Sequence, residues 1–430
     1  MIMKTKKNKK IQKRYLALVL SFVVCFLTSF SALAAGEPVT GGTPGNSLTA
    51  SITKKLKMPE GTTPPTADFI FEFTKDSLNG ETSQTELDRM PVIGDKTISY
   101  APADTGTLDG ETMVLSKQSE NILEGIVFPG AGQYTYHIKE KQNTYSLQSG
   151  ENMTYSGAEY TITFYVKNSE SGPYVSAIAA VIAVADPGNT GVAGDKVDPT
   201  PGDSNGLVFT NIFTRQTGGT DPTDPSQQGL AIGKTVAGDF GDKSKYFDYQ
   251  LTVTKPEVVE DTVTYKAYVV EGSTVVTSLE NTQETLETDG SGYKYFEIVP
   301  GTQTTVKLKH GQKLVLINPY VGSKYEAIES GNPGYTPAVM ITENGGTPVT
   351  NSAGEGESLS TNDLASSKQR VIGENTNLAD FTNTYTGTIT PTGIMIDNLP
   401  FIMILVLALG AFGAFIVVKS NRRRRSHTDY

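Results

Sequence analysis

The sequence is poor in the residues on which many enzymes and most disulfide-bonded extracellular proteins depend. Its 430 residues include one Cys, three His and no Trp. The only thiol, Cys25, lies in an N-terminal apolar run, so the rest of the chain can form neither a disulfide nor a thiolate metal site. In the middle of the chain only His137 and His310 supply imidazoles. We therefore expect no Cys nucleophile, no His-rich metal site and no cofactor.

Charge is unevenly distributed along the chain. The formal net charge is −10, but residues 1–35 carry seven basic groups and no acid, and residues 393–430 carry five basic and two acidic groups. By difference, the intervening chain has a net charge of about −20. Phosphate binding needs a basic face, so this segment is not expected to bind nucleic acid.

Composition and local patterns predict an all-β protein with two domains. The 43 Gly, 22 Pro and 20 Tyr favour strands separated by many turns. A Gly/Pro-rich leader at 36–46 and a Pro/Gly/Asp-rich linker at 215–229 separate a first domain, 47–214, from a second, 230–386. Short alternating apolar runs predict antiparallel sandwiches of Ig-like or transthyretin-like type. These runs lie at 69–73, 134–138 and 160–166 in the first domain, and at 247–253, 306–315 and 339–341 in the second.

The N-terminus is typical of a secretory signal peptide. A basic stretch is followed by an apolar run at 15–30 and by Ala32-Leu33-Ala34, a small-x-small pattern that a signal peptidase accepts. We expect residues 1–35 to be removed, so that the mature protein acts outside the cell. A lipoprotein signal at Cys25 is the alternative, but the large neighbours Val24 and Phe26 disfavour it.

The C-terminal segment, 387–430, contains a predicted membrane span. Residues 399–418 form an uncharged apolar run, and the basic residues that follow predict a cytoplasmic tail. Upstream stand Pro391, Thr392 and Gly393. This order resembles a Gram-positive sorting signal, in which a sortase cuts between Thr and Gly and passes the Thr carbonyl to an amine. The usual L-P-x-T-G is replaced by a P-T-G variant resembling that of some pilins. A plain type I membrane anchor is the alternative.

The two predicted domains share an internal repeat, which is the most informative pattern in the sequence. Each copy has four elements in the same order: an apolar-x-Lys-x-apolar strand, an alternating aromatic strand, a strand that ends in Glu after a Pro/Gly turn, and a closing Phe-Thr-Asn. The elements are 52–56, 69–73, 136–140 and 209–211 in the first copy, and 232–236, 247–251, 325–329 and 381–383 in the second.

Strand alternation places three polar residues of each copy on the core side. Successive side chains of a strand point to opposite faces, so each Lys shares a face with the apolar residues two positions away, as do the Glu and the Asn. The inward-facing residues are Lys54, Glu140 and Asn211 in the first domain, and Lys234, Glu329 and Asn383 in the second.

Burial gives these groups an unusual chemistry. A lone buried charge is costly, and desolvation lowers the pKa of Lys and raises that of Glu, so the pair can become a neutral amine beside a carboxylic acid. The amine is then a nucleophile, and the acid can hydrogen-bond and protonate the Asn carbonyl and help ammonia depart. The product is a Lys–Asn isopeptide bond that the protein forms on itself.

The Lys, Glu and Asn of each copy form a trio. This trio, its strand positions and the sorting signal resemble the pilin isopeptide-linkage domains of Gram-positive major pilins. The resemblance implies tandem transthyretin-like or B-type collagen-adhesin-like sandwiches, with Lys54 joined to Asn211 through Glu140, and Lys234 joined to Asn383 through Glu329. It implies a structural subunit that is not an enzyme but a sortase substrate, linked through Thr392 to other subunits or to peptidoglycan at the cell surface. Contact with the membrane would be limited to the C-terminal span before sorting.

Two questions stay open at this stage. A polymerising pilin needs an exposed acceptor lysine before the last strand of its first domain. Lys196 is the nearest candidate, although it is equally well an ordinary loop lysine, and Lys167 is farther upstream. A wall-anchored or pilus-tip adhesin that uses the same domains as a stalk, with a host surface ligand, is the alternative function, and a carboxylate hydrolase is a third class.

Overall fold

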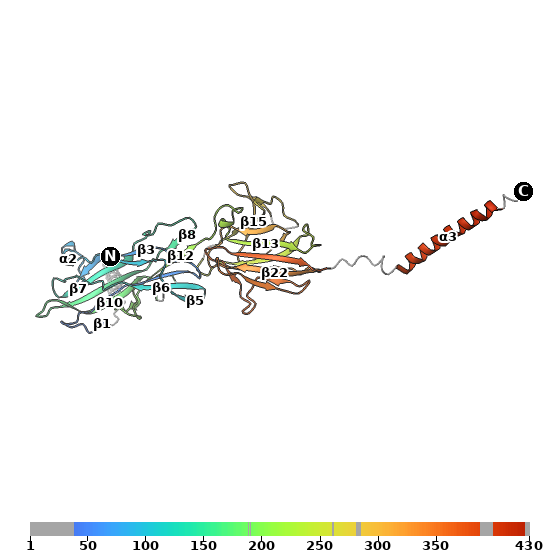
Figure 1. Cartoon of the computed structure of the whole chain (residues 1–430). Coiled ribbons are helices and arrows are strands. Elements are labelled where there is room, and N and C mark those ends of the chain that lie inside the picture. The colour runs from blue at the N-terminus through green and yellow to red at the C-terminus, as the bar shows by residue number, and fades with distance from the viewer. Residues whose placement is uncertain are drawn as a thin grey trace, which may run out of the picture.

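The computed structural model describes residues 38–187, 189, 191–259, 262–280, 285–387 and 399–425. The predicted signal peptide and the residues Pro391, Thr392 and Gly393 lie outside the described residues. The described chain is mostly β, as the alternating runs predict, and forms two sandwiches that lie end to end (Figure 1).

The first domain packs two sheets against each other. One has the order β1-β10-β9-β7-β3-β4, with β11 paired to β10, and the other has the order β5-β6-β2-β12-β8. A short helix, α2 (Gln84–Arg89), follows β3. The strands are β1 (Val39–Thr40), β2 (Thr53–Pro59), β3 (Ala67–Leu78), β4 (Lys96–Tyr100), β5 (Thr107–Asp109), β6 (Thr112–Gln118), β7 (Gly132–Glu140), β8 (Glu151–Thr154), β9 (Glu159–Lys167), β10 (Tyr174–Val184), β11 (Lys196–Val197) and β12 (Val208–Arg215).

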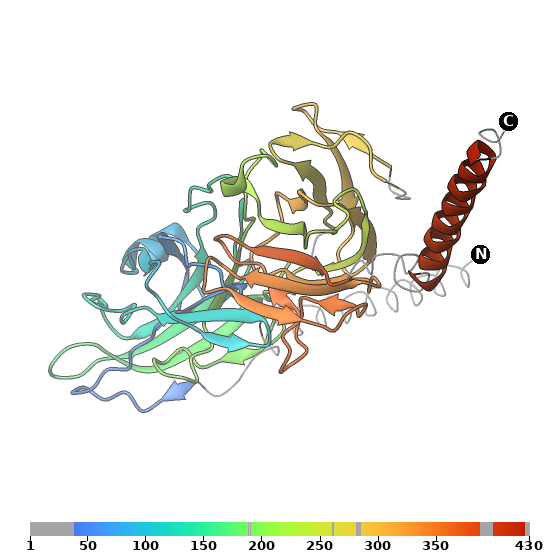
Figure 2. The same ribbon diagram turned by 45° about the vertical axis from the view of Figure 1, so that its right-hand side comes forward.

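The second domain repeats this two-sheet plan (Figures 1 and 2). One sheet has the order β17-β18-β15-β20-β13-β26-β22-β23, with β16 paired to β15, and the other has the order β19-β14-β21-β24, with β25 paired to β21. The strands are β13 (Leu230–Ala237), β14 (Phe247–Thr254), β15 (Tyr265–Glu271), β16 (Thr274–Val275), β17 (Glu287–Thr288), β18 (Lys294–Ile298), β19 (Gln303–Leu308), β20 (Gln312–Leu316), β21 (Lys324–Glu329), β22 (Tyr335–Thr342), β23 (Val349–Ser352), β24 (Leu359–Ser360), β25 (Arg370–Val371) and β26 (Leu378–Tyr385).

Side-chain alternation builds both cores. On β9 every second side chain from Tyr160 to Val166 is buried, while those between them are partly exposed. On β14, Phe247 to Val253 follow the same rule. Aromatic rings fill the space between the sheets, for example Phe71 against Phe209, with ring centroids 4.9 Å apart.

Two details differ from the sequence-based expectations. The run 306–315, predicted as one strand, is split into β19 and β20 by a turn at His310-Gly311, where Gly311 has a φ of +82°. The two strands lie in different sheets, so this turn carries the chain from one layer to the other. The leader is also partly structured, because β1 pairs with β10 through Val39 and Ile178.

The domains contact each other directly where the linker leaves β12. The linker contains a 3-10 turn, η1 (Pro225–Gln227). Arg215 Nη1 lies 2.5 Å from Glu374 Oε1 of the second domain, and the same carboxylate oxygen accepts a hydrogen bond from Thr63 N at 2.8 Å. Close packing continues at Gly322, where an added Cβ would lie 2.5 Å from Cβ of Pro59. These contacts hold the two sandwiches together at one junction.

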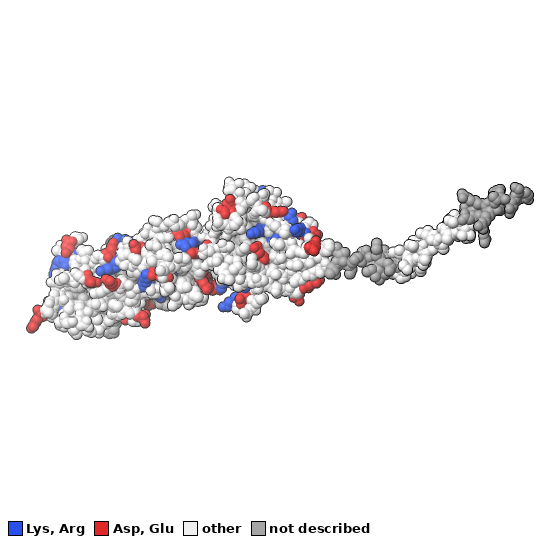
Figure 3. Space-filling view, viewed as in Figure 1, with Lys and Arg blue, Asp and Glu red and all other residues white. Residues whose placement is uncertain are grey.

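The C-terminal helix is α3 (Leu399–Arg425). Within it, Pro400–Lys419 forms a 20-residue stretch of mean hydropathy 2.9 with no part buried against the rest of the described chain. By length and composition this stretch can cross a membrane. Figure 3 shows acidic and basic side chains interspersed over the visible face of both domains, whereas this helix is uncharged over most of its length.

Candidate functional site

The first domain brings together two strands that are far apart in sequence. Strand β2 lies parallel to β12, with Lys54 opposite Phe209 and Leu56 opposite Asn211. Lys54 and Asn211 are therefore two residues apart in register on neighbouring strands of one sheet. Glu140 is the last residue of β7 in the facing sheet. All three side chains point into the space between the layers, as alternation predicts.

Glu140 contacts both other members of the trio. Lys54 Nζ donates to Glu140 Oε2 at 2.7 Å, and Asn211 Nδ2 donates to Glu140 Oε1 at 2.8 Å. Lys54 and Asn211 are 0% exposed and Glu140 is 3% exposed. Lys54 Nζ also lies 4.6 Å from the ring centroid of Phe69, a cation–π contact that partly replaces the lost hydration of the ammonium.

The contact atoms on Asn211 differ from the sequence-based mechanism. That mechanism has the carboxylic acid act on the Asn carbonyl oxygen, whereas Glu140 lies at the amide nitrogen. The reason is the backbone N–H of Ser156, which donates to Asn211 Oδ1 at 2.7 Å. A backbone N–H can only donate, so it fixes which end of the Asn211 amide is the oxygen.

The second domain repeats the arrangement. Strand β13 lies parallel to β26, with Lys234 opposite Phe381 and Val236 opposite Asn383, which is the same two-residue offset. Glu329 ends β21 in the facing sheet.

At this second trio, one carboxylate oxygen serves both partners. Lys234 Nζ donates to Glu329 Oε1 at 2.6 Å, and Asn383 Nδ2 donates to the same oxygen at 2.5 Å. Lys234 Nζ lies 3.8 Å from the ring centroid of Phe247. All three members of the trio are at most 2% exposed.

The two trios differ at the Asn carbonyl. Asn211 Oδ1 has its backbone donor, whereas Asn383 Oδ1 is buried without a hydrogen-bond partner among the described residues. The residue opposite Asn383 on the neighbouring strand β22 is Pro337, which has no N–H to offer.

Burial shifts the acid–base properties of both Lys–Glu pairs in the same direction. Desolvation lowers the pKa of Lys54 and of Lys234 to about 8, even though the neighbouring carboxylate opposes the shift. Desolvation also raises the pKa of Glu140 and of Glu329. The gap between amine and carboxyl pKa values is therefore narrower than in water, which makes the neutral amine and the neutral acid accessible together.

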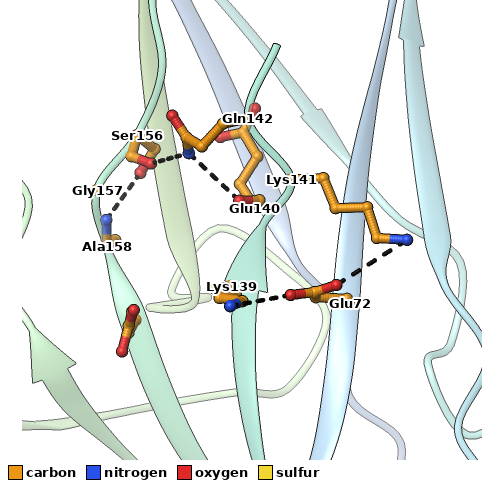
Figure 4. Close-up of a pocket in the computed structure, with 9 residues that line it drawn as sticks. Glu72, Lys139, Glu140, Lys141, Gln142, Ser156, Gly157 and Ala158 are labelled. Carbon is orange, nitrogen blue, oxygen red and sulfur yellow. Dashed lines mark hydrogen bonds and ion pairs between the residues drawn. The ribbon is translucent and has the colours of Figure 1, made fainter. Parts of the chain in front are cut away.

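The surroundings of Glu140 include residues that sequence reasoning did not identify. A surface pocket of about 520 Å³ lies beside the end of β7 and is lined by Gln142 and Ser156 among others (Figure 4). Gln142 Nε2 donates to the backbone oxygens of Glu140 at 3.3 Å and Ser156 at 3.1 Å. Asp186 Oδ2 accepts from Ser156 Oγ at 2.6 Å. In the sequence these are ordinary loop residues, with no pattern to mark them.

The remaining predicted site residues are not part of either trio. Lys196 begins β11 at the edge of a sheet, opposite Val181, and is exposed. Lys167, at the end of β9, is exposed as well. Within the described ranges, no group of three or more His, Cys, Asp or Glu side chains could hold a metal ion.

Each domain matches a family model of its own. Residues 50–214 match the Spy0128-like isopeptide containing domain, and residues 228–385 match a domain of unknown function, DUF7601. The first match confirms the resemblance to isopeptide domains that was drawn from the sequence. A search of curated proteins finds no match to the chain.

Solved structures with similar chains include major pilins of Streptococcus pyogenes and a pilus-presented adhesin. The major pilin is 18% identical over 79% of this chain and 99% of that chain, with a TM-score of 0.30. The major pilin T3.2 is 20% identical over 79% of this chain and 98% of that chain, also with a TM-score of 0.30. The pilus-presented adhesin Spy0125 (Cpa) is 17% identical over 53% of this chain and 35% of that chain, with a TM-score of 0.22.

Proposed function

We propose that this chain, which carries a Spy0128-like isopeptide containing domain, is a structural subunit of a sortase-assembled pilus on a Gram-positive cell surface. Two autocatalytic bonds, Lys54–Asn211 and Lys234–Asn383, staple its domains. Its sortase partner joins Thr392, which lies outside the described residues, to another subunit or to peptidoglycan.

The observation that carries this proposal is the duplication of one buried geometry. Each domain buries a Lys and an Asn on parallel neighbouring strands with the same two-residue offset, and a Glu from the facing sheet contacts both. Isolated buried Lys and Glu side chains are costly, so two copies of the same arrangement indicate a function that needs them.

The chemistry follows from the contacts at the first trio. The neutral Lys54 amine attacks Cγ of Asn211 while Glu140 is the protonated acid. Glu140 gives its proton to Nδ2 of Asn211, which leaves as ammonia, and the resulting carboxylate takes up the proton that the attacking amine releases, so the C–N isopeptide bond remains and the acid is restored. Since Glu140 already contacts the attacking and the leaving nitrogen, the same carboxyl group can serve both steps. Glu329 has the same contacts with Lys234 and Asn383.

The isopeptide bonds would supply the covalent crosslinks that a chain without disulfides lacks. Lys54 lies near the start of the first domain and Asn211 lies on its last strand, so the bond joins the two ends of the domain. Closing a loop of roughly 150 residues stabilises by about 5 kcal/mol on the chain-entropy model. Under tension along a pilus, force would pass through the bond instead of separating β2 from β12.

Polymerisation needs a surface amine that accepts the Thr392 carbonyl. Lys196 is our proposed acceptor because it is exposed on an edge strand, and Lys167 is the competing lysine. If the chain is instead a wall-anchored or tip adhesin, it would carry the same staples without forming a polymer.

The mass of the native protein tests the staples. Two bonds lower the intact mass of the secreted chain by two ammonia molecules, and a digest yields branched peptides that join Lys54 to Asn211 and Lys234 to Asn383. An unmodified mass would reject the proposal. Boiling cell-wall extracts in SDS separates the two roles, because a pilus backbone gives a ladder of covalent polymers and an adhesin gives a single band.

A further inference from the structure

The loop after β8 is built around the carbonyl oxygen of Asn211. Strand β8 pairs with β12 up to Thr154, opposite Ile212, and the chain then leaves the ladder. This departure turns the backbone N–H of Ser156 away from the usual strand partner and toward Asn211 Oδ1, at 2.7 Å. Asn211 is 0% exposed, so water does not compete for this oxygen.

Several contacts hold the Ser156 peptide in place. Asp186 accepts from Ser156 Oγ at 2.6 Å and, more weakly, from the backbone N–H of Gly157 and of Thr210, both at 3.4 Å. Thr210 is the residue before Asn211, so Asp186 joins the loop to the strand that presents the reacting amide. Gln142 also donates to the Ser156 carbonyl (Figure 4).

This position matters because of where charge develops. When an amine adds to the Asn211 amide carbon, the C=O bond becomes single and the oxygen gains negative charge. A fixed N–H in a dry site stabilises that oxygen more strongly than it stabilises the starting carbonyl, which is how an oxyanion hole accelerates acyl transfer. Glu140 contacts the nitrogen and leaves the oxygen to Ser156.

We propose that the backbone N–H of Ser156 is the oxyanion donor for the Lys54–Asn211 bond, with Asp186 as its positioning residue, and that the second site lacks this donor. This inference rests on the proposed isopeptide function. The second site supports it by contrast, because Asn383 Oδ1 is buried with no partner among the described residues. The first bond should therefore form faster than the second, by up to about 100-fold.

Refolding of the full chain tests the inference. Chain recovered unfolded from inclusion bodies is diluted into detergent-containing buffer, and the branched peptide of each site is quantified by mass spectrometry over time. Circular dichroism records folding separately. In the wild type we expect the Lys54–Asn211 peptide to accumulate before the Lys234–Asn383 peptide. Equal rates, or the reverse order, would contradict the proposed difference between the sites.

Variants then distinguish the role of the Ser156 N–H from that of Asp186. Ser156→Pro removes the N–H and should slow the first bond by about 100-fold while leaving the second unchanged. Asp186→Ala keeps the N–H but frees the loop, and should slow the first bond by about 10-fold. Asp186→Asn retains an acceptor for the Ser156 hydroxyl and should restore most of the rate. A merely structural role of Asp186 would change the folding trace and not the ratio of the two bonds.

The second site is the internal reference for every variant. If Ser156→Pro fails to fold, Asp186→Ala and its rescue by Asp186→Asn decide the matter. The inference is wrong if Asp186→Ala forms the first bond at the wild-type rate. If the wild-type chain folds but forms neither branched peptide, it is the proposed function that fails.

Discussion

Lys54 and Glu140 face each other across the two sheets of the first domain, with Nζ and Oε2 2.7 Å apart and neither side chain accessible to solvent. A buried ion pair of this kind is weak evidence for stability by itself, because the cost of desolvating two charges offsets their attraction. Its value here is chemical, since the same burial that is costly for the charges favours the neutral forms that can react.

Replacing Glu140 should block one bond only. In Glu140→Ala no carboxyl group remains to move the proton from Lys54 to Asn211, so the intact mass should lie one ammonia, and not two, below the mass calculated from the variant's own sequence, while the Lys234–Asn383 peptide persists. Glu329→Ala should give the opposite pattern. Glu72→Ala is the matched control, because Glu72 lines the same pocket near Glu140 but belongs to neither trio. A Glu140→Ala chain with both branched peptides would contradict the catalytic role.

The first bond should raise the stability of its domain. The double variant Lys54→Met, Glu140→Gln removes the bond without leaving an unpaired buried charge, so the remaining effect reports mainly on the staple. We expect the free energy of unfolding of the first domain to fall by up to about 5 kcal/mol. Calorimetry measures this, and the transition of the second domain serves as the reference. An unchanged first transition would mean that the crosslink contributes little.

The rate of bond formation should depend on pH in a bell shape. The reactive pair holds one proton in total, on Glu140 with Lys54 neutral. Below the raised pKa of Glu140 both groups are protonated and the amine cannot attack. Above the pKa of Lys54, about 8, the pair has lost its last proton and Glu140 cannot act as an acid. Refolding at pH values on both sides of 8 measures the descending limb, and a rate that keeps rising well above pH 8 would contradict this assignment.

The sequence predicts that the side chains of the trios point inward, because this direction depends only on neighbouring residues of the same strand. Ile52 and Leu56 flank Lys54 at spacing two, and a period of two is enough to assign a face. The repeat then predicts the same for Lys234. The parallel pairing of β2 with β12 is not local, yet the resemblance to known isopeptide domains anticipates that Lys54 and Asn211 meet.

The contacts that the sequence does not predict are those that depend on how loops fold back to the site. Ser156 and Asp186 follow different strands, and only the folded chain brings both to Asn211. The sequence also does not predict which atom of the Asn211 amide Glu140 contacts. The Ser156 N–H in the loop decides which end of that amide faces the carboxylate. The turn at Gly311 is missed because apolar alternation continues on both sides of it, although β19 and β20 lie in different sheets.

The domain junction should depend on Glu374. Its carboxylate accepts from Arg215 Nη1 at 2.5 Å and from Thr63 Oγ1 at 2.6 Å, both in the first domain. Glu374→Ala should free the two sandwiches to move relative to each other, which small-angle scattering would record as a broader distribution of interatomic distances. The expected effect on domain stability is small, because these groups are partly exposed. Glu297→Ala, at an exposed position on β18, is the control and should leave the scattering unchanged.

Polymer formation should identify the acceptor amine. If Lys196 accepts the Thr392 carbonyl, Lys196→Ala should abolish the SDS-resistant ladder on cells that express the sortase, while the intramolecular bonds still form because Lys196 belongs to neither trio. Lys196→Arg should also fail, since a guanidinium that stays protonated is no nucleophile. Lys167→Ala is the matched control, because Lys167 is exposed at the end of β9 in the same sheet. Loss of the ladder in Lys167→Ala and its retention in Lys196→Ala would move the acceptor to Lys167.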